Sequence, residues 1–182
     1  HWVDEAQPTG DLLGRATLGA AAGQVLVCDT TSVNFYQLAL AAIHARPGRK
    51  TVIIDAAHNP HGAQSLRKTM KDEFDFDTII AVIAPMGDKD VDGILEELES
   101  VVNRVIVSKN SSHRAADLSE LKASAQGIFG SERVTAIESL QEALVKAIEQ
   151  AKLDNGVSDS NTAVLVAGSV VTAGESRGII RR

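Results

Sequence analysis

Short runs of aliphatic, often β-branched residues alternate with amphipathic segments along most of the chain. Six such runs are expected to be strands, at residues 25–28, 51–55, 78–83, 104–107, 133–136 and 163–167. Most are continuously apolar, as strands are when helices cover both faces of a parallel sheet. The alternation therefore predicts an α/β fold, a three-layer Rossmann-like domain with a mostly parallel sheet of about six strands and helices on both faces.

The segments between these runs carry the apolar repeat of helices. Four helices are expected after residue 50, at residues 60–73, 91–102, 117–128 and 138–151. Asn59 and Pro60 suit the N-cap and the first position of the first of them. Two further helices are expected upstream, at residues 9–22 and 33–45, and residues 154–161 are polar enough to form a loop insertion.

Composition excludes several classes of protein. Aromatic residues make up 3% of the chain and the net charge is −6, which argues against a nucleic-acid or an anionic-membrane partner. Cys28 is the single cysteine, so no internal disulfide can form and a reducing cytoplasm is the expected location. The sequence has no apolar run of membrane-spanning length and no signal-peptide pattern, and its first residue, His1, suggests a piece of a longer protein.

Polar residues and glycines follow four of the expected strands. They occupy residues 55–60, 85–90, 108–114 and 168–175. Ligands of open parallel sheets bind beyond the carboxyl ends of the strands, so these segments predict one functional face. A carboxylate such as that of Asp55 can accept hydrogen bonds from two ribose hydroxyls, and lysine and arginine side chains can neutralise phosphates or a substrate carboxylate.

Each of these residues also has a structural interpretation. Asn59 can simply start a helix, Asp55 can cap a turn, and His58 can be a hydrogen-bonded loop histidine. Residues 88–90 can form a solvated, charged turn, and residues 168–169 can turn the chain off the last strand. The functional interpretation gains weight because all of these features occur together.

Several motifs of known chemistry are absent from the sequence. No G-x-x-x-x-G-K-[ST] segment is present, so the chain has no P-loop to hold a triphosphate. No G-x-G-x-x-G follows a strand, which argues against a dinucleotide-dependent dehydrogenase. His58 and His61 are a weak substitute for the histidine spacing of a metal site, so no metal ligands are assigned.

The strand-end motifs resemble those of one enzyme family. Residues 55–63, DAAHNPHGA, resemble the D-x-A-H-N-P-x-G/A signature of folylpolyglutamate and dihydrofolate synthases, which are ATP-dependent amide ligases of the Mur type. Residues 86–90, MGDKD, are similar to the D-K-D segment of that family, and residues 167–175, AGSVVTAGE, to its closing G-S-x-x-x-x-G-E segment. The resemblance covers residues 51–182.

The resemblance implies a reaction and a set of roles. In this family ATP phosphorylates a carboxylate of folate or dihydropteroate, and L-glutamate displaces the phosphate. Asp55 is then expected to contact the ATP ribose, with the catalytic His58 and the cofactor-binding Asn59 beside the nucleotide. Lys89 is expected near the substrate or phosphates as a second catalytic residue, and Ser169 near the glutamate. The P-loop and the Mg²⁺ ligands lie in the family's N-terminal domain, so no activity is expected of residues 1–182 alone.

Upstream of residue 51 the sequence is similar to a different family. Residues 9–15, 28–34 and 46–50 resemble the early part of kynureninase, an enzyme that depends on pyridoxal phosphate. This resemblance implies a chimera of residues 1–50 and 51–182, or a designed α/β scaffold without activity. Pyridoxal phosphate is not an expected cofactor, because the Schiff-base lysine segment is absent. Residues 30–34 are interpreted as a helix cap rather than a phosphate site. Arg49 lies too close to Asp55 to match the ligases' ATP-binding arginine.

Overall fold

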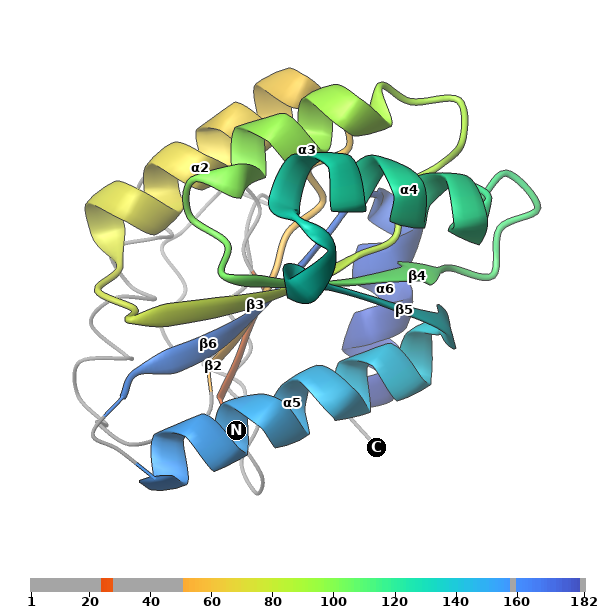
Figure 1. Ribbon diagram of the computed structural model, residues 1–182. Coiled ribbons are helices and arrows are strands. Elements are labelled where there is room, and N and C mark those ends of the chain that lie inside the picture. The colour runs from red at the N-terminus through yellow and green to blue at the C-terminus, as the bar shows by residue number, and fades with distance from the viewer. Residues whose placement is uncertain (1–23, 28–50, 158–159, 181–182) are drawn as a thin grey trace, which may run out of the picture.

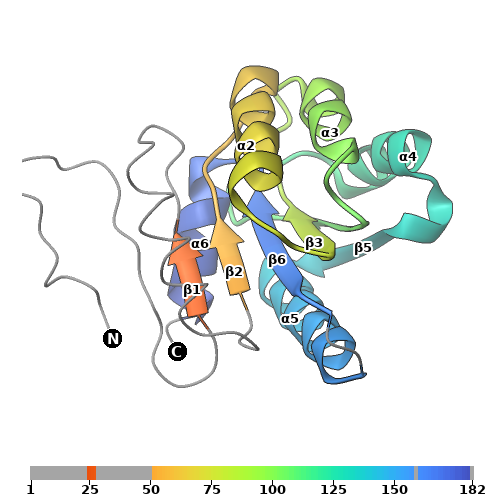
Figure 2. The same cartoon turned by 90° about the vertical axis from the view of Figure 1, so that its left-hand side faces the viewer.

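The computed structural model describes residues 24–27, 51–157 and 160–180, and its centre is a parallel sheet of six strands. The strands lie in the order β1-β2-β6-β3-β4-β5 (Figures 1 and 2). Their bounds are Gln24–Val27 for β1, Thr51–Ile54 for β2, Thr78–Ile83 for β3, Arg104–Lys109 for β4, Val134–Ser139 for β5 and Thr162–Ala167 for β6. Every pair of neighbours is parallel.

Helices cover both faces of the sheet, as Figure 2 shows. One face carries α2 (Pro60–Glu73), α3 (Val91–Glu99) and α4 (Leu118–Phe129), and the other carries α5 (Leu140–Val157) and α6 (Val170–Ile180). A short 3-10 helix, Ser131–Arg133, precedes β5. Strand residues alternate between the two cores: in β3, Ile79, Ala81 and Ile83 face α2–α4, whereas Ile80 and Val82 face α5 and α6. The predicted three-layer α/β fold is confirmed.

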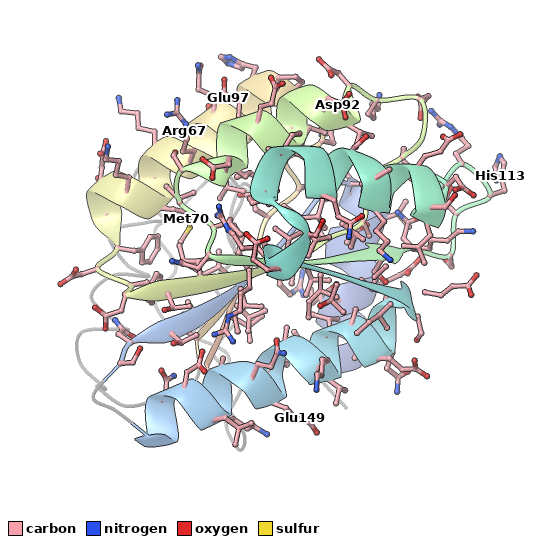
Figure 3. All side chains as sticks on the ribbon, in the orientation of Figure 1. Arg67, Met70, Asp92, Glu97, His113 and Glu149 are labelled. Carbon is pink, nitrogen blue, oxygen red and sulfur yellow. The ribbon has the colours of Figure 1, made fainter. Side chains whose placement is uncertain are left out.

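The outer helix layer presents a charged surface over an apolar interior. Met70 of α2 is 2% exposed and points toward the sheet. On the solvent side, Arg67 of α2 and Glu97 of α3 form an ion pair of 3.1 Å (Figure 3). In the part of the chain that the structure describes, no helix combines the length and the hydropathy that crossing a membrane requires.

The last strand in sequence lies in the middle of the sheet. The chain passes from β2 through α2 to β3, then outward through β4 to β5, and α5 brings it back across the opposite face to place β6 between β2 and β3 (Figure 1). The segments that follow β2 and β6 consequently leave the sheet toward opposite faces, into α2 and α6. Such a switch point is where open α/β sheets bind ligands.

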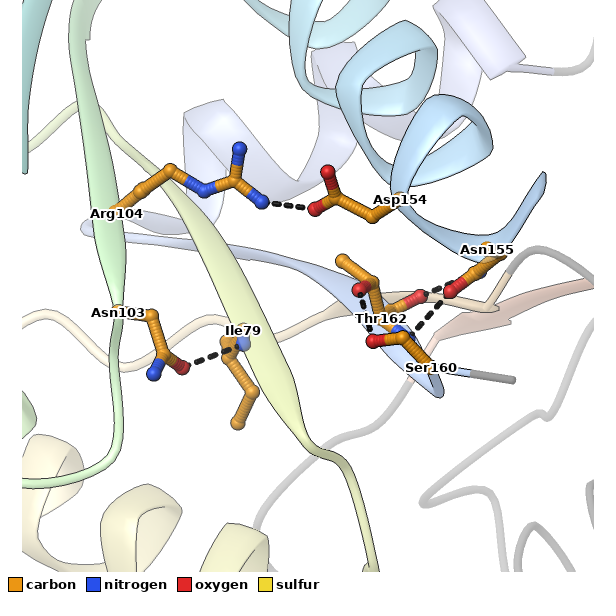
Figure 4. A network of polar contacts seen from close by, with 7 residues as sticks. All are labelled: Ile79, Asn103, Arg104, Asp154, Asn155, Ser160 and Thr162. Carbon is orange, nitrogen blue, oxygen red and sulfur yellow. Dashed lines mark hydrogen bonds and ion pairs between the residues drawn. The ribbon is translucent and has the colours of Figure 1, made fainter. Parts of the chain in front are cut away.

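Polar contacts hold the opposite, amino-terminal edge of the sheet together (Figure 4). Arg104 at the start of β4 pairs with Asp154 near the end of α5. The Asn155 side chain accepts from the Thr162 backbone N–H at 2.7 Å and donates to the Thr162 carbonyl at 3.1 Å. Asn103 accepts from the backbone N–H of Ile79 at 2.8 Å. The contacts of Asp154 and Asn155 hold the end of α5 against β4 and β6, and the contact of Asn103 ties the start of β4 to β3.

The largest departures from the prediction are the end of one helix and one helix that was not predicted. The helix expected at 138–151 begins at Leu140 and continues to Val157, so α5 takes in half of the loop expected at 154–161, because Asp154 and Asn155 hold its last turns against the sheet. Helix α6 was not predicted at all. Its first residues are β-branched and it contains Gly174 and Gly178, which lower helix propensity. The helices expected at 9–22 and 33–45 lie outside the described residues.

Candidate functional site

Main-chain hydrogen bonds join the carboxyl ends of the central strands. The Asp55 N–H donates to the Val166 carbonyl at 2.9 Å, and the Gly168 N–H donates to the Ala57 carbonyl at 2.9 Å. Gly168 has φ +121°, and a Cβ there would lie 2.9 Å from the carbonyl carbon of Ala84. Only glycine fits this crossing comfortably. The segments after β2, β3 and β6, all of which the sequence singled out, are therefore in direct contact.

Asp55 lies at this junction and is fully buried. Its Oδ1 accepts a hydrogen bond from the Ala57 N–H at 2.7 Å, two residues ahead. This contact is an Asx-type turn, in which a short carboxylate side chain takes the place of a backbone carbonyl. The structural interpretation of Asp55 as a turn cap is therefore observed, and its role toward a ribose stays a prediction.

His58 and Asn59 form the entry to α2. Asn59 has extended φ and ψ, and its Oδ1 accepts from the Gly62 N–H at 2.8 Å, which is the N-cap geometry expected from the sequence. The half-buried His58 places Nδ1 3.0 Å from the carbonyl oxygen of Ala56. Because a carbonyl only accepts, the neutral ring must carry its proton on Nδ1, which leaves Nε2 as an acceptor.

The loop after β3 is held by the loop after β4. Met86 and Ala115 form an antiparallel bridge, and the Gly87 N–H donates to the Arg114 carbonyl at 2.8 Å. Asp88 accepts from Arg114 Nη2 at 2.5 Å, and Lys89 Nζ lies 3.7 Å from the same carboxylate oxygen. Lys89, a predicted catalytic residue, is thus presented on an ordered turn at the carboxyl edge.

Asp88 has a lowered pKa. Desolvation raises its pKa, but the hydrogen bond and charge of Arg114, with the charge of Lys89, outweigh that effect. We expect Arg114→Ala to raise the pKa of Asp88 toward the ordinary value of an aspartate, and a carboxyl-carbon NMR titration measures this shift. The pair stabilises the fold above the unfolded-state pKa and loses that contribution as the pH falls through the folded-state pKa.

Lys68→Ala is the matched control, since Lys68 is an exposed cation on α2 and not a partner of Asp88. It should leave the Asp88 titration where the wild-type protein has it. An unchanged Asp88 titration in Arg114→Ala would contradict the assigned cause of the lowered pKa.

Ser169 lies directly before α6 and is 2% exposed. Its hydroxyl oxygen accepts from the Thr172 N–H at 2.9 Å, as an N-cap does, and lies 2.8 Å from the Thr172 hydroxyl. The side-chain amide of Asn110, which follows β4, donates to the Ser169 hydroxyl oxygen at 3.3 Å. Ser169 is at the expected strand end, with its hydroxyl turned into the protein. Its contact with glutamate stays a prediction.

Sequence reasoning missed the polar partners of Ser169. Asn110 and Thr172 are buried, yet neither was singled out, although both lie inside the polar segments 108–114 and 168–175. Glu175, from the same closing motif, accepts from the Ser111 N–H at 3.1 and 3.2 Å and from its hydroxyl. The loop after β4 is therefore tied to α6 on one side and to the loop after β3 on the other.

The described residues do not form a metal site. No group of three or more His, Cys, Asp or Glu side chains gathers within residues 24–27, 51–157 and 160–180 in a way that could hold a metal ion. Lys89, Arg114 and Asp88 form a cationic cluster around one carboxylate instead. The described part of this edge can therefore supply positive charge and a histidine acceptor.

Comparison with known proteins identifies relatives of this arrangement. The chain is 41% identical over 180 residues to the dihydrofolate synthase/folylpolyglutamate synthase of Mycobacterium tuberculosis, covering 92% of this chain and 36% of that protein. The crystal structure of M. tuberculosis folylpolyglutamate synthase complexed with ADP and AMPPCP matches with 44% identity and a TM-score of 0.69, over 72% of this chain and 30% of that one. E. coli FolC in complex with DHPP and ADP matches with 28% identity and a TM-score of 0.58, over 74% and 31%.

These matches do not support the kynureninase resemblance of residues 1–50. The M. tuberculosis alignment covers 92% of the 182 residues, which is more than the 132 residues from 51 to 182, so it extends upstream of residue 51. A division of the chain at residue 50 stays a prediction, because most of residues 1–50 lie outside the described part.

The family profile agrees with the geometry of the strand-end site. The profile described as "Mur ligase, glutamate ligase domain" matches residues 41–170, which include β2 to β6 and the segments that follow β2, β3 and β4. Asp55, His58, Asn59, Lys89 and Ser169 all lie within the match. The chain therefore belongs to the Mur ligase family, through its glutamate ligase domain.

Proposed function

We propose that this chain is the nucleotide- and glutamate-binding part of an ATP-dependent folylpolyglutamate/dihydrofolate synthase. The observation that carries the proposal is the contact between three motif-bearing strand ends around Gly168 at the switch point of the sheet. The relative of 44% identity is a folylpolyglutamate synthase complexed with ADP and AMPPCP, and the relative of 28% identity is a FolC protein in complex with DHPP and ADP. The chain spans 36% of the length of the M. tuberculosis relative, so the complete reaction is part of the proposal.

In the proposed reaction the γ-phosphoryl group of ATP moves to a carboxylate oxygen of folate or dihydropteroate. The amino group of L-glutamate then attacks the acyl carbon, an amide bond forms, and inorganic phosphate leaves. Such transfers depend mainly on positioning and on neutralising charge at the phosphoryl oxygens. The sequence contains no P-loop, so the triphosphate must be held mainly by residues outside this chain.

The proposed roles of the strand-end residues follow from their positions. Asp55 would accept from the ATP ribose hydroxyls, and Asn59 at the start of α2 would lie beside the nucleotide. Lys89 would place its ammonium group near the transferring phosphate or the substrate carboxylate. His58 Nε2, free to accept when the ring is neutral, would lie at the reacting centre. Ser169 and the start of α6 would lie beside the incoming glutamate.

Two cofactor assignments complete the proposal. Mg²⁺ accompanies ATP in phosphoryl transfer generally, but the described residues offer no fitting ligand group, so no step is assigned to a metal held here. Pyridoxal phosphate is not part of the proposed chemistry. We expect the protein to work in the cytoplasm, because its single cysteine, Cys28, suits a reducing compartment.

Titration with ATP, followed by amide NMR, tests nucleotide binding. We expect the signals of Ala57, His58 and Gly168 to shift with a dissociation constant of about 1 mM, since only part of the site is present. Lys89→Ala should weaken ATP binding by about threefold to tenfold, because it removes one cation. Asp55→Asn should weaken it further, because it removes the charge from the proposed ribose acceptor.

The matched control is Lys68→Ala, which removes an exposed cation from the outer face of α2. It should leave the titration unchanged if binding is local to the strand ends. Saturable shifts in the last turns of α2 or in α5, without shifts at the strand ends, would refute the proposed position. No shifts at several millimolar ATP would favour an inactive α/β scaffold.

A further inference from the structure

Three buried polar side chains connect the carboxyl ends of β3, β4 and β6. Asn110, Ser169 and Thr172 are 6%, 2% and 0% exposed. Asn110 and Thr172 both donate to the Ala84 carbonyl, and Ser169 contacts these two residues. We propose that Asn110 is a positioning residue of the strand-end site, which fixes the direction of the Ser169 hydroxyl and with it the first turn of α6. The functional consequence of this inference rests on the proposed function, whereas its structural consequence does not.

The orientation of the Asn110 amide has one consistent solution. Nδ2 donates to the Ala84 carbonyl at 3.0 Å, and Oδ1 accepts from the Ser112 N–H at 3.0 Å. Exchanging the two amide atoms would set an oxygen against the Ala84 oxygen and an NH₂ group against the Ser112 N–H. Both contacts would be repulsive, so the two backbone groups together determine which way the amide points.

The direction of each hydroxyl proton follows from this orientation. Asn110 Nδ2 donates to Thr172 Oγ1 at 3.0 Å, and Thr172 gives its only proton to the Ala84 carbonyl at 2.5 Å. In the 2.8 Å contact between the two hydroxyls, Ser169 must therefore be the donor. Thr172 Oγ1 accepts hydrogen bonds from both Asn110 and Ser169, and the orientation of the Asn110 amide determines the direction of these hydrogen bonds.

Ser169 uses its proton inside the cluster. That proton goes to Thr172, and the Ser169 oxygen accepts from the Thr172 N–H. The two Asn110 amide protons go to the Ala84 carbonyl and to Thr172 Oγ1, both at 3.0 Å, so the longer 3.3 Å contact of Nδ2 with the Ser169 oxygen shares one of these protons. Because Ser169 is 2% exposed and its proton is used, it acts on a neighbouring glutamate through the position of the first turn of α6, and Asn110 holds that position from the loop after β4.

Asn110→Asp tests the inference with little change in shape. A carboxylate still accepts from the Ser112 N–H, but it repels the Ala84 carbonyl and draws the hydroxyl protons of Ser169 and Thr172 toward itself. Protonation at low pH restores one donor. We expect the amide protection factor of Thr172, measured by hydrogen exchange, to fall about tenfold at neutral pH and to recover as the pH is lowered. The wild-type factor should stay constant across the same range.

Thr172→Val is the second variant, since it keeps the side-chain shape and removes the receiving hydroxyl. It should lower the protection of the residue 172 amide at every pH, with no recovery. Asn155→Asp is the matched control, because Asn155 makes an equivalent pair of backbone contacts to Thr162 at the opposite edge of the sheet. It should leave the protection of Thr172 unchanged. A pH-independent protection factor in Asn110→Asp, equal to that of the wild-type protein, overturns the inference.

Kinetics in a full-length ligase that contains this domain test the functional consequence. Asn110→Asp should raise KM for glutamate by about tenfold and change KM for ATP by less than about twofold. Equal losses for both substrates would mean a general loss of structure and would overturn the positioning role. If the unmodified full-length ligase shows no ATP-dependent ligation, the proposed function fails, and hydrogen exchange still decides the role of Asn110.

Discussion

Replacing Gly168 with alanine is expected to lower the free energy of unfolding by about 3 kcal/mol or more. The backbone at Gly168 has φ +121°, where a side chain costs about 1–3 kcal/mol. An added Cβ would also lie 2.9 Å from the Ala84 carbonyl carbon and from the Pro85 nitrogen, both of them backbone atoms that cannot move independently. Urea unfolding followed by far-UV circular dichroism measures the change in the free energy of unfolding.

Gly127→Ala is the matched glycine control. Gly127 lies in α4, and a Cβ there would meet nothing within 4 Å. Alanine should stabilise the domain by about 0.5–1 kcal/mol, because glycine is the poorer helix former. Equal effects of the two substitutions would mean that Gly168 is not held in the crossing between the loops after β2 and β3.

The second large effect is expected at the centre of the sheet. Leu165 of β6 is fully buried, and its backbone lies between Ile53 of β2 and Ala81 of β3. Leu165→Ala should lower the free energy of unfolding by about 3–4 kcal/mol, because the rigid neighbours of a central strand cannot collapse into the cavity. The same urea measurement gives this value, and the slope of the transition should stay constant.

Leu153→Ala is the matched control, because it makes the same leucine-to-alanine change at an exposed position. Leu153 lies on α5 and its side chain is 67% exposed. Its truncation should change the free energy of unfolding by less than about 0.5 kcal/mol. A loss of less than about 1 kcal/mol for Leu165→Ala would be inconsistent with the central placement of β6.

Local pattern was sufficient to predict most of the fold. The apolar runs of the strands and the N-cap at Asn59 are signals that neighbouring residues supply, and α2 has the bounds that were expected for it. Helix α6 was not predicted, because the helix propensity of its residues is weak. It is stabilised by tertiary contacts of Ala173, Ile179 and Ile180 with the sheet, together with the Ser169 cap, and no local signal predicts such contacts.

In the candidate site, too, local motifs predicted some residues, whereas contacts between distant residues were not predicted. Asp55, His58 and Lys89 were predicted as site residues because they follow strands within recognisable motifs, and their roles stay a prediction. Asn110 and Thr172 were missed because their hydrogen bonds join residues 62 positions apart, and a single sequence does not reveal such a pairing. The inward direction of the Ser169 hydroxyl depends on these partners, so it also could not be predicted.

The central position of β6 has a consequence for how the domain assembles. Thr51 of β2 pairs with Ala163 of β6, which lies far from it in the sequence. Strands β2 and β3 do not pair with each other, and each pairs with β6. Contacts of such sequence separation carry a large loop-closure entropy and slow folding. During synthesis from the N-terminus we therefore expect the ladder that joins β2 to β3 to form last, once β6 has emerged.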